Sequence, residues 1–285
     1  NTCRTADEYL ENDGRGRFTL RAGRIPAVIE FTHQLIAADV DGDGSADLVK
    51  LSMSAFSPNS HLFLNDGSGH FRHAQVFANV ASFPHFDAGD LNGDGCADLV
   101  SGDVAGPRAV KLLMGSPQGQ LFDNTWRLPY GASTWHGLPR LADLDADGDL
   151  DIAVPERQTR SGAYPVVRFW QNDGAAHFTD VSDAFMPVVG DEFPPPRPVW
   201  YYDVLTTVPA DQDGDGDVDL LVIPGVAPAP PPGGFTLWNL TRHIETSGNP
   251  SVGQSSYRVS AFADPGHVVI PLASLGRTIL GLPGL

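Results

Sequence analysis

The sequence predicts an all-β protein, a β-propeller of about five four-stranded blades, on three observations. An acidic segment that contains glycine occurs four times, and a short apolar run follows it each time. An Asn-Asp-Gly turn between two apolar runs occurs three times. The chain also has 31 glycines and 24 prolines among 285 residues, which suits many turns rather than long helices.

The acidic segments begin 51, 53 and 68 residues apart. They are DVDGDGSADLV from Asp39, DLNGDGCADLV from Asp90, DLDADGDLDIAV from Asp143 and DQDGDGDVDLLV from Asp211. The apolar runs that end these segments are short and show no sustained helical period, so each predicts a strand.

The turn segments alternate with the acidic segments. They are YLENDGRGRF (residues 9–18), LFLNDGSGHF (62–71), FWQNDGAAHF (169–178) and a degenerate copy, LLMGSPQGQLF (112–122). The Asn-Asp-Gly turn predicts a β-hairpin, because asparagine and glycine accept positive φ. Each unit therefore holds about four short strands in roughly 50 residues, which is the period of a propeller blade.

We expect a single β-propeller domain over residues 1–285, with approximate repeats 1–38, 39–89, 90–142, 143–210 and 211–285. The chain starts with a hairpin and ends with predicted strands at 235–240, 257–262 and 267–272. A C-terminal strand that paired with the N-terminal hairpin would close the ring and cover its edges. Alternatively, the chain is part of a larger ring. Two proline-rich insertions, 190–200 and 224–234, are predicted to protrude as stiff surface loops, since proline cannot join a sheet ladder.

Each acidic segment is predicted to bind Ca²⁺. Positions 1, 3, 5 and 9 place carboxylates within a few Å, where they raise one another's pKa unless a cation is present. A flexible shell of about six to eight oxygens suits Ca²⁺ better than Mg²⁺. We therefore expect about four ions. The predicted side-chain ligands are Asp39, Asp41, Asp43, Asp47; Asp90, Asn92, Asp94, Asp98; Asp143, Asp145, Asp147, Asp151; and Asp211, Asp213, Asp215, Asp219. Position 7 would contribute the backbone carbonyls of Ser45, Cys96, Asp149 and Asp217.

An EF-hand is the alternative for such a loop, but it needs a bidentate glutamate at position 12 and a helix after it. Position 12 is Lys50, Ser101, Val154 or Val222, and the residues that follow predict a strand. The loops are therefore expected in a sheet.

At these residues the sequence resembles the FG-GAP/VCBS repeat family. Members of this family include integrin α-subunit propellers, propeller lectins and many secreted bacterial surface proteins. The resemblance runs from about Tyr9 to Val222, and the segment FTDVSDAF (178–185) also resembles bacterial members. It implies structural Ca²⁺ sites on the blades of a β-propeller. The chain departs from the family in its degenerate third hairpin and in lacking clear Phe-Gly and Gly-Ala-Pro boxes.

Composition and motifs argue against several classes of function. The net charge of −17 disfavours nucleic acid or an anionic membrane as a partner. Pro271, Arg277 and Pro283 interrupt the apolar tail, so we expect no membrane insertion. Known catalytic motifs are lacking and the acids are committed to the loops, which predicts that the protein is not an enzyme. Cys3 and Cys96 could form a disulfide or remain thiols, and Asn239 begins a single glycosylation sequon.

Aromatic residues supply candidates for ligand contact. Trp135 with His136 and Trp200 with Tyr202 precede acidic loops, so they are predicted to lie near a face where they could stack on a sugar. His33, His85 and His136 precede their loops at similar distances. They could line a central pore or each close a backbone hydrogen bond.

These features lead to three functional hypotheses. The first is a secreted or cell-surface calcium-binding propeller that acts as a non-catalytic adhesion or recognition module for a glycan or an extracellular protein. The second is a self-associating structural subunit of an extracellular filament or surface assembly. The third is the accessory propeller of a larger extracellular enzyme. Weak calcium sites fill at extracellular calcium concentrations, which favours an extracellular or cell-surface location.

Overall fold

The computed structural model describes residues 7–30, 32–52, 59–78, 85–102, 110–129, 138–155, 167–182, 204–212, 214, 216–224, 235–239 and 268–270. Within these ranges the protein is all-β, as predicted, with one short 3₁₀ helix, η1 (Thr125–Arg127). The strands form four four-stranded sheets and one two-stranded sheet.

The two-stranded sheet is the N-terminal hairpin of β1 (Leu10–Asn12) and β2 (Phe18–Leu20). The first four-stranded sheet contains β3 (Thr32–Ala38), β4 (Asp47–Ser52), β5 (Asn59–Asn65) and β6 (Phe71–Ala78). The second contains β7 (His85–Gly89), β8 (Asp98–Gly102), β9 (Val110–Met114) and β10 (Phe122–Asp123). The third contains β11 (Arg140–Ala142), β12 (Asp151–Pro155), β13 (Val167–Asn172) and β14 (Phe178–Asp180). The fourth contains β15 (Val204–Ala210), β16 (Asp219–Pro224), β17 (Phe235–Asn239) and β18 (Val268–Ile270).

Each four-stranded sheet is a meander whose strands follow chain order. All neighbours in these sheets are antiparallel except β17 and β18, which are parallel. The first strand of each sheet lies before an acidic loop, and the second strand begins at position 9 of that loop. A sheet therefore takes its first strand from one predicted repeat and its other strands from the next.

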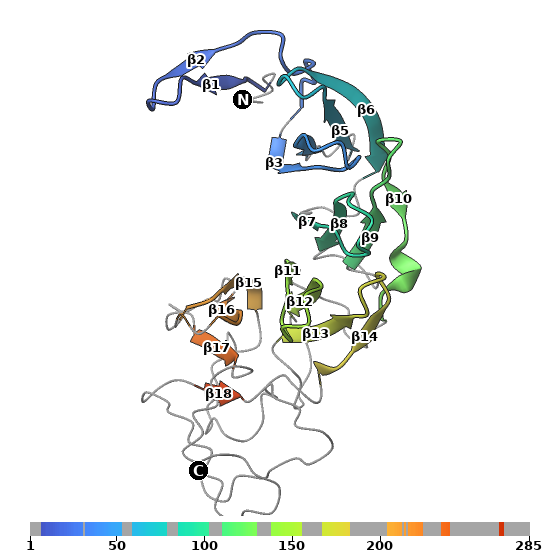
Figure 1. The fold of residues 1–285 in the computed structure, drawn as a ribbon, viewed down its shortest axis with the longest axis vertical. Helices are drawn as coiled ribbons and strands as arrows, with labels where there is room; N and C mark the ends of the chain where they lie inside the picture. The colour runs from blue at the N-terminus through green and yellow to red at the C-terminus, as the bar shows by residue number, and fades with distance from the viewer. Residues whose placement is uncertain are drawn as a thin grey trace, which may run out of the picture.

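The four sheets follow one another along an arc, with β1 and β2 at one end (Figure 1). Their first strands lie on the inner side of the arc, where β3 contacts β7, β7 contacts β11, and β11 contacts β15. β6, β10 and β14 lie on the outer side. The described strands therefore have the radial order of propeller blades, with one strand of each sheet near a common centre.

The apolar core lies between consecutive sheets, because each strand sends alternate side chains to opposite faces. In β8, Leu99 belongs to the cluster shared with the first sheet, and its neighbour Val100 belongs to the cluster shared with the third. In β12, Ile152 belongs to the cluster shared with the second sheet, and Ala153 belongs to the cluster shared with the fourth. A sheet that buries both faces cannot be removed without exposing the core of its neighbours.

Side-chain amides also join the first and second sheets. On the inner side, Gln34 donates from Nε2 to the carbonyl of Phe86 (3.0 Å) and accepts from its N–H (2.8 Å). On the outer side, Gln75 makes the same pair of bonds with the backbone of Leu121, at 3.0 and 2.8 Å. The two sheets are therefore held at both ends of their shared face.

The predicted hairpins form, but one part of their expected geometry is wrong. The positive φ values in the Asn-Asp-Gly turns belong to glycines such as Gly14 and Gly67, and not to the asparagines. Asn65 instead accepts the N–H groups of Gly67 (3.2 Å) and Gly69 (3.0 Å) at its side-chain oxygen. The degenerate copy also turns back as a hairpin, from β9 to β10. Asparagine acts here through its side chain, as in an Asx turn.

Residues 7–30 lie against the first sheet through a polar cluster. Lys50, with a side chain that is 0% exposed, donates to Asp7 Oδ2 (2.6 Å) and to the carbonyl of Val28 (2.9 Å). His61 joins Glu30 on one side and His73 on the other, each at 3.0 Å. The Lys50–Asp7 ion pair and the hydrogen bond between His61 and Glu30 therefore hold residues 7–30 against the sheet.

The hairpin of β1 and β2 exposes apolar side chains. Leu10, Phe18 and Leu20 are 57%, 60% and 52% exposed, whereas Phe63 and Trp170, which correspond to Leu10 in the repeat, are 1% and 2% exposed. In the described residues β1 pairs only with β2. The pairing expected to close the ring is not among the described strand pairs.

Candidate metal centre

The acidic loops join the first and second strands of the four-stranded sheets. We call them the first (39–47), second (90–98), third (143–151) and fourth (211–219) loops, numbered from position 1 to position 9. β4, β8, β12 and β16 all begin at position 9. A strand follows every loop, as predicted, which is incompatible with an EF-hand.

The position 9 aspartates are fully buried, and backbone N–H groups satisfy both oxygens in the first three loops. One oxygen accepts the N–H of position 2, in the pairs Val40–Asp47 (2.9 Å), Leu91–Asp98 (3.0 Å) and Leu144–Asp151 (2.9 Å). The other accepts an N–H at the end of the third strand, in the pairs Asn65–Asp47 (2.8 Å), Gly115–Asp98 (2.8 Å) and Asn172–Asp151 (2.9 Å). Position 9 therefore joins each loop to the hairpin of its own sheet.

Burial controls the electrostatics of position 9. It raises the pKa of Asp47 and of Asp98 to about 6 and that of Asp151 to about 7, against the lowering effect of the N–H donors. Other aspartates of the same loops add to these rises. A divalent cation would oppose both causes, because it favours the charged carboxylate.

The loop backbone wraps around the carboxylate at position 1. The N–H of the glycine at position 6 donates to this carboxylate in every loop, in the pairs Gly44–Asp39 (2.8 Å), Gly95–Asp90 (2.8 Å), Gly148–Asp143 (3.1 Å) and Gly216–Asp211 (3.1 Å). Position 5 is exposed in the first three loops, where its carboxylate accepts the N–H of position 7.

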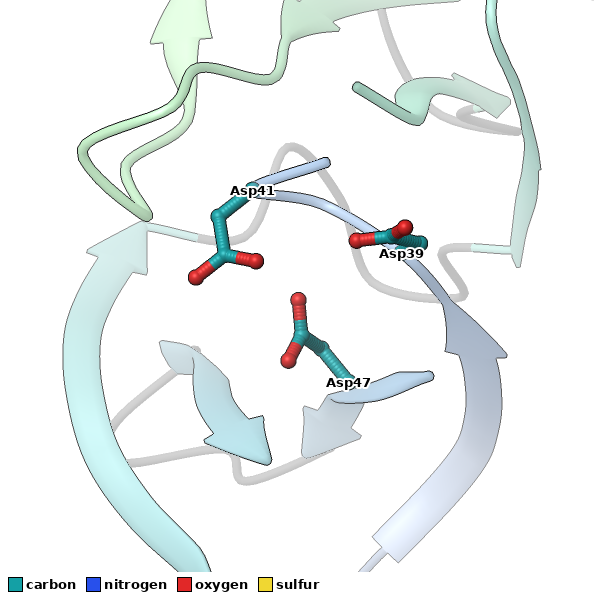
Figure 2. Close-up of side chains that lie close together, drawn as sticks. All are labelled: Asp39, Asp41 and Asp47. Carbon is teal, nitrogen blue, oxygen red and sulfur yellow. The ribbon is translucent and has the colours of Figure 1, made fainter. Parts of the chain in front are cut away.

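Two loops bring three carboxylates together. In the first loop, oxygens of Asp39, Asp41 and Asp47 all lie within 4.8 Å of one another, and Figure 2 shows these carboxylates facing a common space. In the third loop, Asp143, Asp145 and Asp151 form the same arrangement. The clusters use positions 1, 3 and 9, and the position 5 residues Asp43 and Asp147 are not part of them.

Oxygens without hydrogen-bond partners show that these clusters fit a cation. Asp41 Oδ1 and Asp143 Oδ1 are buried atoms that have no hydrogen-bond partner among the described residues. Burial and the neighbouring carboxylates raise the pKa of Asp41. A buried acceptor without a donor is costly, and a hard, oxygen-preferring ion such as Ca²⁺ is the group that this donor set would satisfy.

The other two loops contribute partial information. In the second loop position 3 is Asn92, whose amide nitrogen donates to Asp94 (3.0 Å). In the fourth loop Asp213 and Asp215 lie outside the described residues. Asp211 and Asp219 are described, and Asp219 accepts the N–H of Gln212 (3.0 Å), which is the bond that position 9 makes in the other loops.

Position 7 holds a feature that the sequence analysis missed. We expected only its carbonyl to contribute, but Asp149 also has a buried Oδ1 without a partner among the described residues. Burial and the other loop aspartates raise its pKa to about 6. The missed signal is an acid at position 7 where the first two loops have Ser45 and Cys96. Cys96 is a buried free thiol, and Cys3 lies outside the described residues.

The predicted ligand-contact residues Trp135, His136, Trp200 and Tyr202 also lie outside the described residues, as do residues 190–200 and 225–234. His33 and His85 lie on the inner strands β3 and β7. Burial and the nearby guanidinium of Arg140 lower the pKa of His85. Among the described residues, no helix is long and apolar enough to cross a membrane.

Comparison with known proteins gives one family match. Residues 90–154 match the family model described as "FG-GAP-like repeat". This segment contains the whole of the second and third loops, with the strands β8 to β11 and β12 as far as Val154. A comparison with curated proteins finds no match.

A solved structure that is similar to this chain is that of a lectin from Agrocybe aegerita, described as specifically recognising non-reducing terminal N-acetylglucosamine. It is 18% identical, with a TM-score of 0.43. The match covers 78% of this chain and 61% of the lectin chain.

Proposed function

We propose that this chain, which carries an FG-GAP-like repeat at residues 90–154, is an extracellular, calcium-stabilised β-propeller of about five blades. We further propose that it is a non-catalytic recognition module for a glycan or a protein. The observation that carries the calcium sites is the carboxylate cluster that occurs at the same place in the first and third sheets, with buried oxygens that have no donor among the described residues.

The residues that would hold the ion in the first loop are Asp39, Asp41 and Asp47, and the third loop offers the equivalent set. Bound Ca²⁺ would supply positive charge that neutralises these carboxylates. The chain itself provides the rest of the site, since peptide N–H groups orient positions 1 and 9 before an ion arrives. Four such ions would also offset part of the net charge of −17.

Calcium should stabilise the fold by mass action, because only the folded chain forms the clusters. A melt in calcium and in a chelator tests this. We expect a melting temperature that rises with calcium concentration, and a smaller rise for Asp41→Asn. Glu8→Gln, at an exposed acid outside the loops, should respond to calcium as the natural protein does. Identical melts in calcium and in chelator would contradict the calcium sites.

Recognition by a propeller face is the part of the proposal that needs a ligand screen. A glycan array and a panel of extracellular proteins, each with Trp135→Ala as a variant, would identify the partner class. Trp126 is a useful second variant, because it lies in η1 and is 65% exposed. We expect binding that Trp135→Ala abolishes and Trp126→Ala leaves unchanged. Absence of binding to both panels would reject the recognition function.

A structural subunit is the second candidate, and the exposed hairpin of β1 and β2 favours it. Leu10 and Phe18 present apolar surface on a two-stranded sheet that pairs with no other described strand, which is a feature that promotes association. Size-exclusion chromatography over a range of concentrations should then show larger species that Phe18→Asp removes. A single monomer peak at all concentrations would exclude this candidate.

A further inference from the structure

The first and second acidic loops are joined by a direct backbone hydrogen bond. The N–H of Ala97, at position 8 of the second loop, donates to the carbonyl of Asp39, at position 1 of the first loop (2.7 Å). The two loops also touch at Gly42, where an added Cβ would lie 3.3 Å from Cys96 Sγ. These loops belong to different sheets, so the contact connects two candidate ion sites.

This hydrogen bond is part of a chain that links one predicted ligand to another. The peptide unit between Asp39 and Val40 accepts from Ala97 at its carbonyl, and its N–H donates to Asp47, the position 9 ligand of the first loop (2.9 Å). The peptide unit that contains the Ala97 N–H also contains the Cys96 carbonyl, which is the predicted position 7 ligand of the second loop. Hydrogen bonds in series polarise one another, so a cation on the Cys96 carbonyl makes the Ala97 N–H a stronger donor and strengthens the chain from its donor end.

The second and third loops are linked by a side chain. Asn172, at the end of β13, donates from Nδ2 to the carbonyl of Leu91 in the second loop (2.8 Å) and to that of Leu150 in the third (3.0 Å). Its backbone N–H donates to Asp151, the position 9 ligand of the third loop (2.9 Å). One buried residue therefore contacts both loops and a predicted ligand.

Asn65 occupies the corresponding position in the first sheet and makes only part of these contacts. Its N–H donates to Asp47 (2.8 Å), and its side-chain nitrogen donates to Ala46 of the same loop (3.0 Å). In the hydrogen bonds described for Asn65, no partner belongs to the acidic loop of another sheet. The chain thus contains a matched control for Asn172.

We propose that neighbouring calcium loops bind their ions cooperatively, and that Asn172 is the residue that couples the second and third loops. The inference rests on the proposed calcium function, and it adds that a bound ion in one loop raises the affinity of the next. Ordering one loop fixes the carbonyl that the shared donor needs, so the next ion orders fewer groups when it binds. The coupling must be reciprocal, with the same factor in both directions.

Site-resolved titration is the direct test. The amides of Gly95 and Gly148 donate to the position 1 carboxylates of the second and third loops, so their NMR signals report the two sites separately. Asp145→Ala disables the third loop. We expect this change to weaken calcium binding at Gly95 by about fivefold in the natural background, at the low end of measured couplings. In an Asn172→Ala background the same change should leave Gly95 unaffected, whereas an Asn65→Ala background should keep the full effect.

The outcomes separate this inference from the calcium proposal itself. If neither glycine signal responds to calcium, the proposed calcium function fails. If both respond but Asp145→Ala leaves binding at Gly95 unchanged in the natural background, cooperative binding is wrong while the calcium sites stand. If the effect persists in Asn172→Ala, the loops are coupled but Asn172 is not the coupling residue. The first comparison needs no change at Asn172, so it holds even if the Asn172 variant fails to fold.

Discussion

At the scale of single residues, the acidic loops contain carboxylates with different surroundings. Position 9 is buried and held by two peptide N–H groups in the first three loops, whereas Asp41 and Asp143 each keep a buried oxygen that has no donor in the described part of the chain. The hydrogen bonds at position 9 fix the place of its carboxylate, whereas the unpartnered oxygens of Asp41 and Asp143 remain available to coordinate an ion. The two kinds of aspartate should therefore respond differently to substitution and to pH.

The first prediction concerns pH in the absence of calcium. The folded-state pKa values of about 6 for Asp47 and Asp98 and about 7 for Asp151 lie above those of an unfolded chain, so the folded state binds more protons between about pH 4 and 7. Stability in chelator should consequently fall as pH rises from about 4 to about 7, and level off above that. Calcium should remove much of this loss because it favours the charged carboxylates. Melts at pH 5, 6, 7 and 8, with calcium and with chelator, test this, and equal slopes in the two series would contradict it.

The second prediction concerns the buried lysine. Asp7→Asn would leave the ammonium group of Lys50 without its carboxylate, at a site where the lysine side chain is 0% exposed and Asp7 is 23% exposed. We expect a loss of about 2 kcal/mol, somewhat below the usual value for a buried pair because Asp7 keeps contact with solvent. Lys50→Met, which removes the charge and keeps the apolar stem, should cost less. Urea denaturation of both variants measures these losses in the free energy of unfolding. A larger loss for Lys50→Met than for Asp7→Asn would show that the ion pair does not hold residues 7–30.

At the scale of elements, the loops and hairpins act as one unit. Sequence alone predicts the strands, because the repeats place a leucine- and valine-rich run after every acidic loop and an apolar run on each side of every turn. It could not predict that position 9 would accept an N–H from the hairpin, since that bond joins residues such as Asp151 and Asn172 that are 21 apart in the chain. It also could not predict the link from Asn172 to Leu91, which depends on how two sheets pack.

The third prediction uses a difference between loops at position 4. Loops one, two and four have glycine there, but the third has Ala146, which adopts a positive φ of 62°. We expect Ala146→Gly to stabilise the protein by about 0.5 kcal/mol, as the relief of strain exceeds the entropy that glycine adds to the unfolded chain. Gly42→Ala should destabilise it by more than about 1 kcal/mol, because φ is +70° and the new Cβ would lie 3.2 Å from the carbonyl oxygen of Gly95. Denaturation midpoints measure both, and a destabilised Ala146→Gly would show that the third loop has no such strain.

At the scale of the whole molecule, each sheet shares its core and its hydrogen bonds with the next. The inner and outer glutamine bridges, Gln34 and Gln75, both join the first sheet to the second. Sequence analysis could predict the number of strands in a unit but not these bridges, because neither glutamine belongs to a repeated motif. Nor does the pattern of the repeats explain why β18 runs parallel to β17.

The fourth prediction follows from these bridges. Gln34→Ala removes two hydrogen bonds and leaves the Phe86 backbone without partners for its N–H and carbonyl, so we expect a loss of about 2 kcal/mol. Hydrogen exchange should also show the first sheet opening more readily than the third. Gln34→Glu, which can accept from Phe86 N–H but cannot donate, should give an intermediate loss. Uniform protection in all sheets of Gln34→Ala would indicate that the apolar core alone couples them.

The offset between repeats and sheets has a consequence for how such a chain can change in length. β7 lies at the end of the predicted repeat 39–89 but pairs within the second sheet, and β3, β11 and β15 are placed in the same way. Each of the first four predicted repeats therefore contributes its last strand to the sheet of the next repeat. Duplicating or deleting one whole repeat in the gene would thus leave every remaining sheet with its first strand from the preceding repeat, and no strand would be left unpaired at the junction. Expression fragments that begin or end at the acidic loops would separate the first strand of a sheet from its other strands. Fragments that begin just before β3, β7, β11 or β15 would keep each sheet whole.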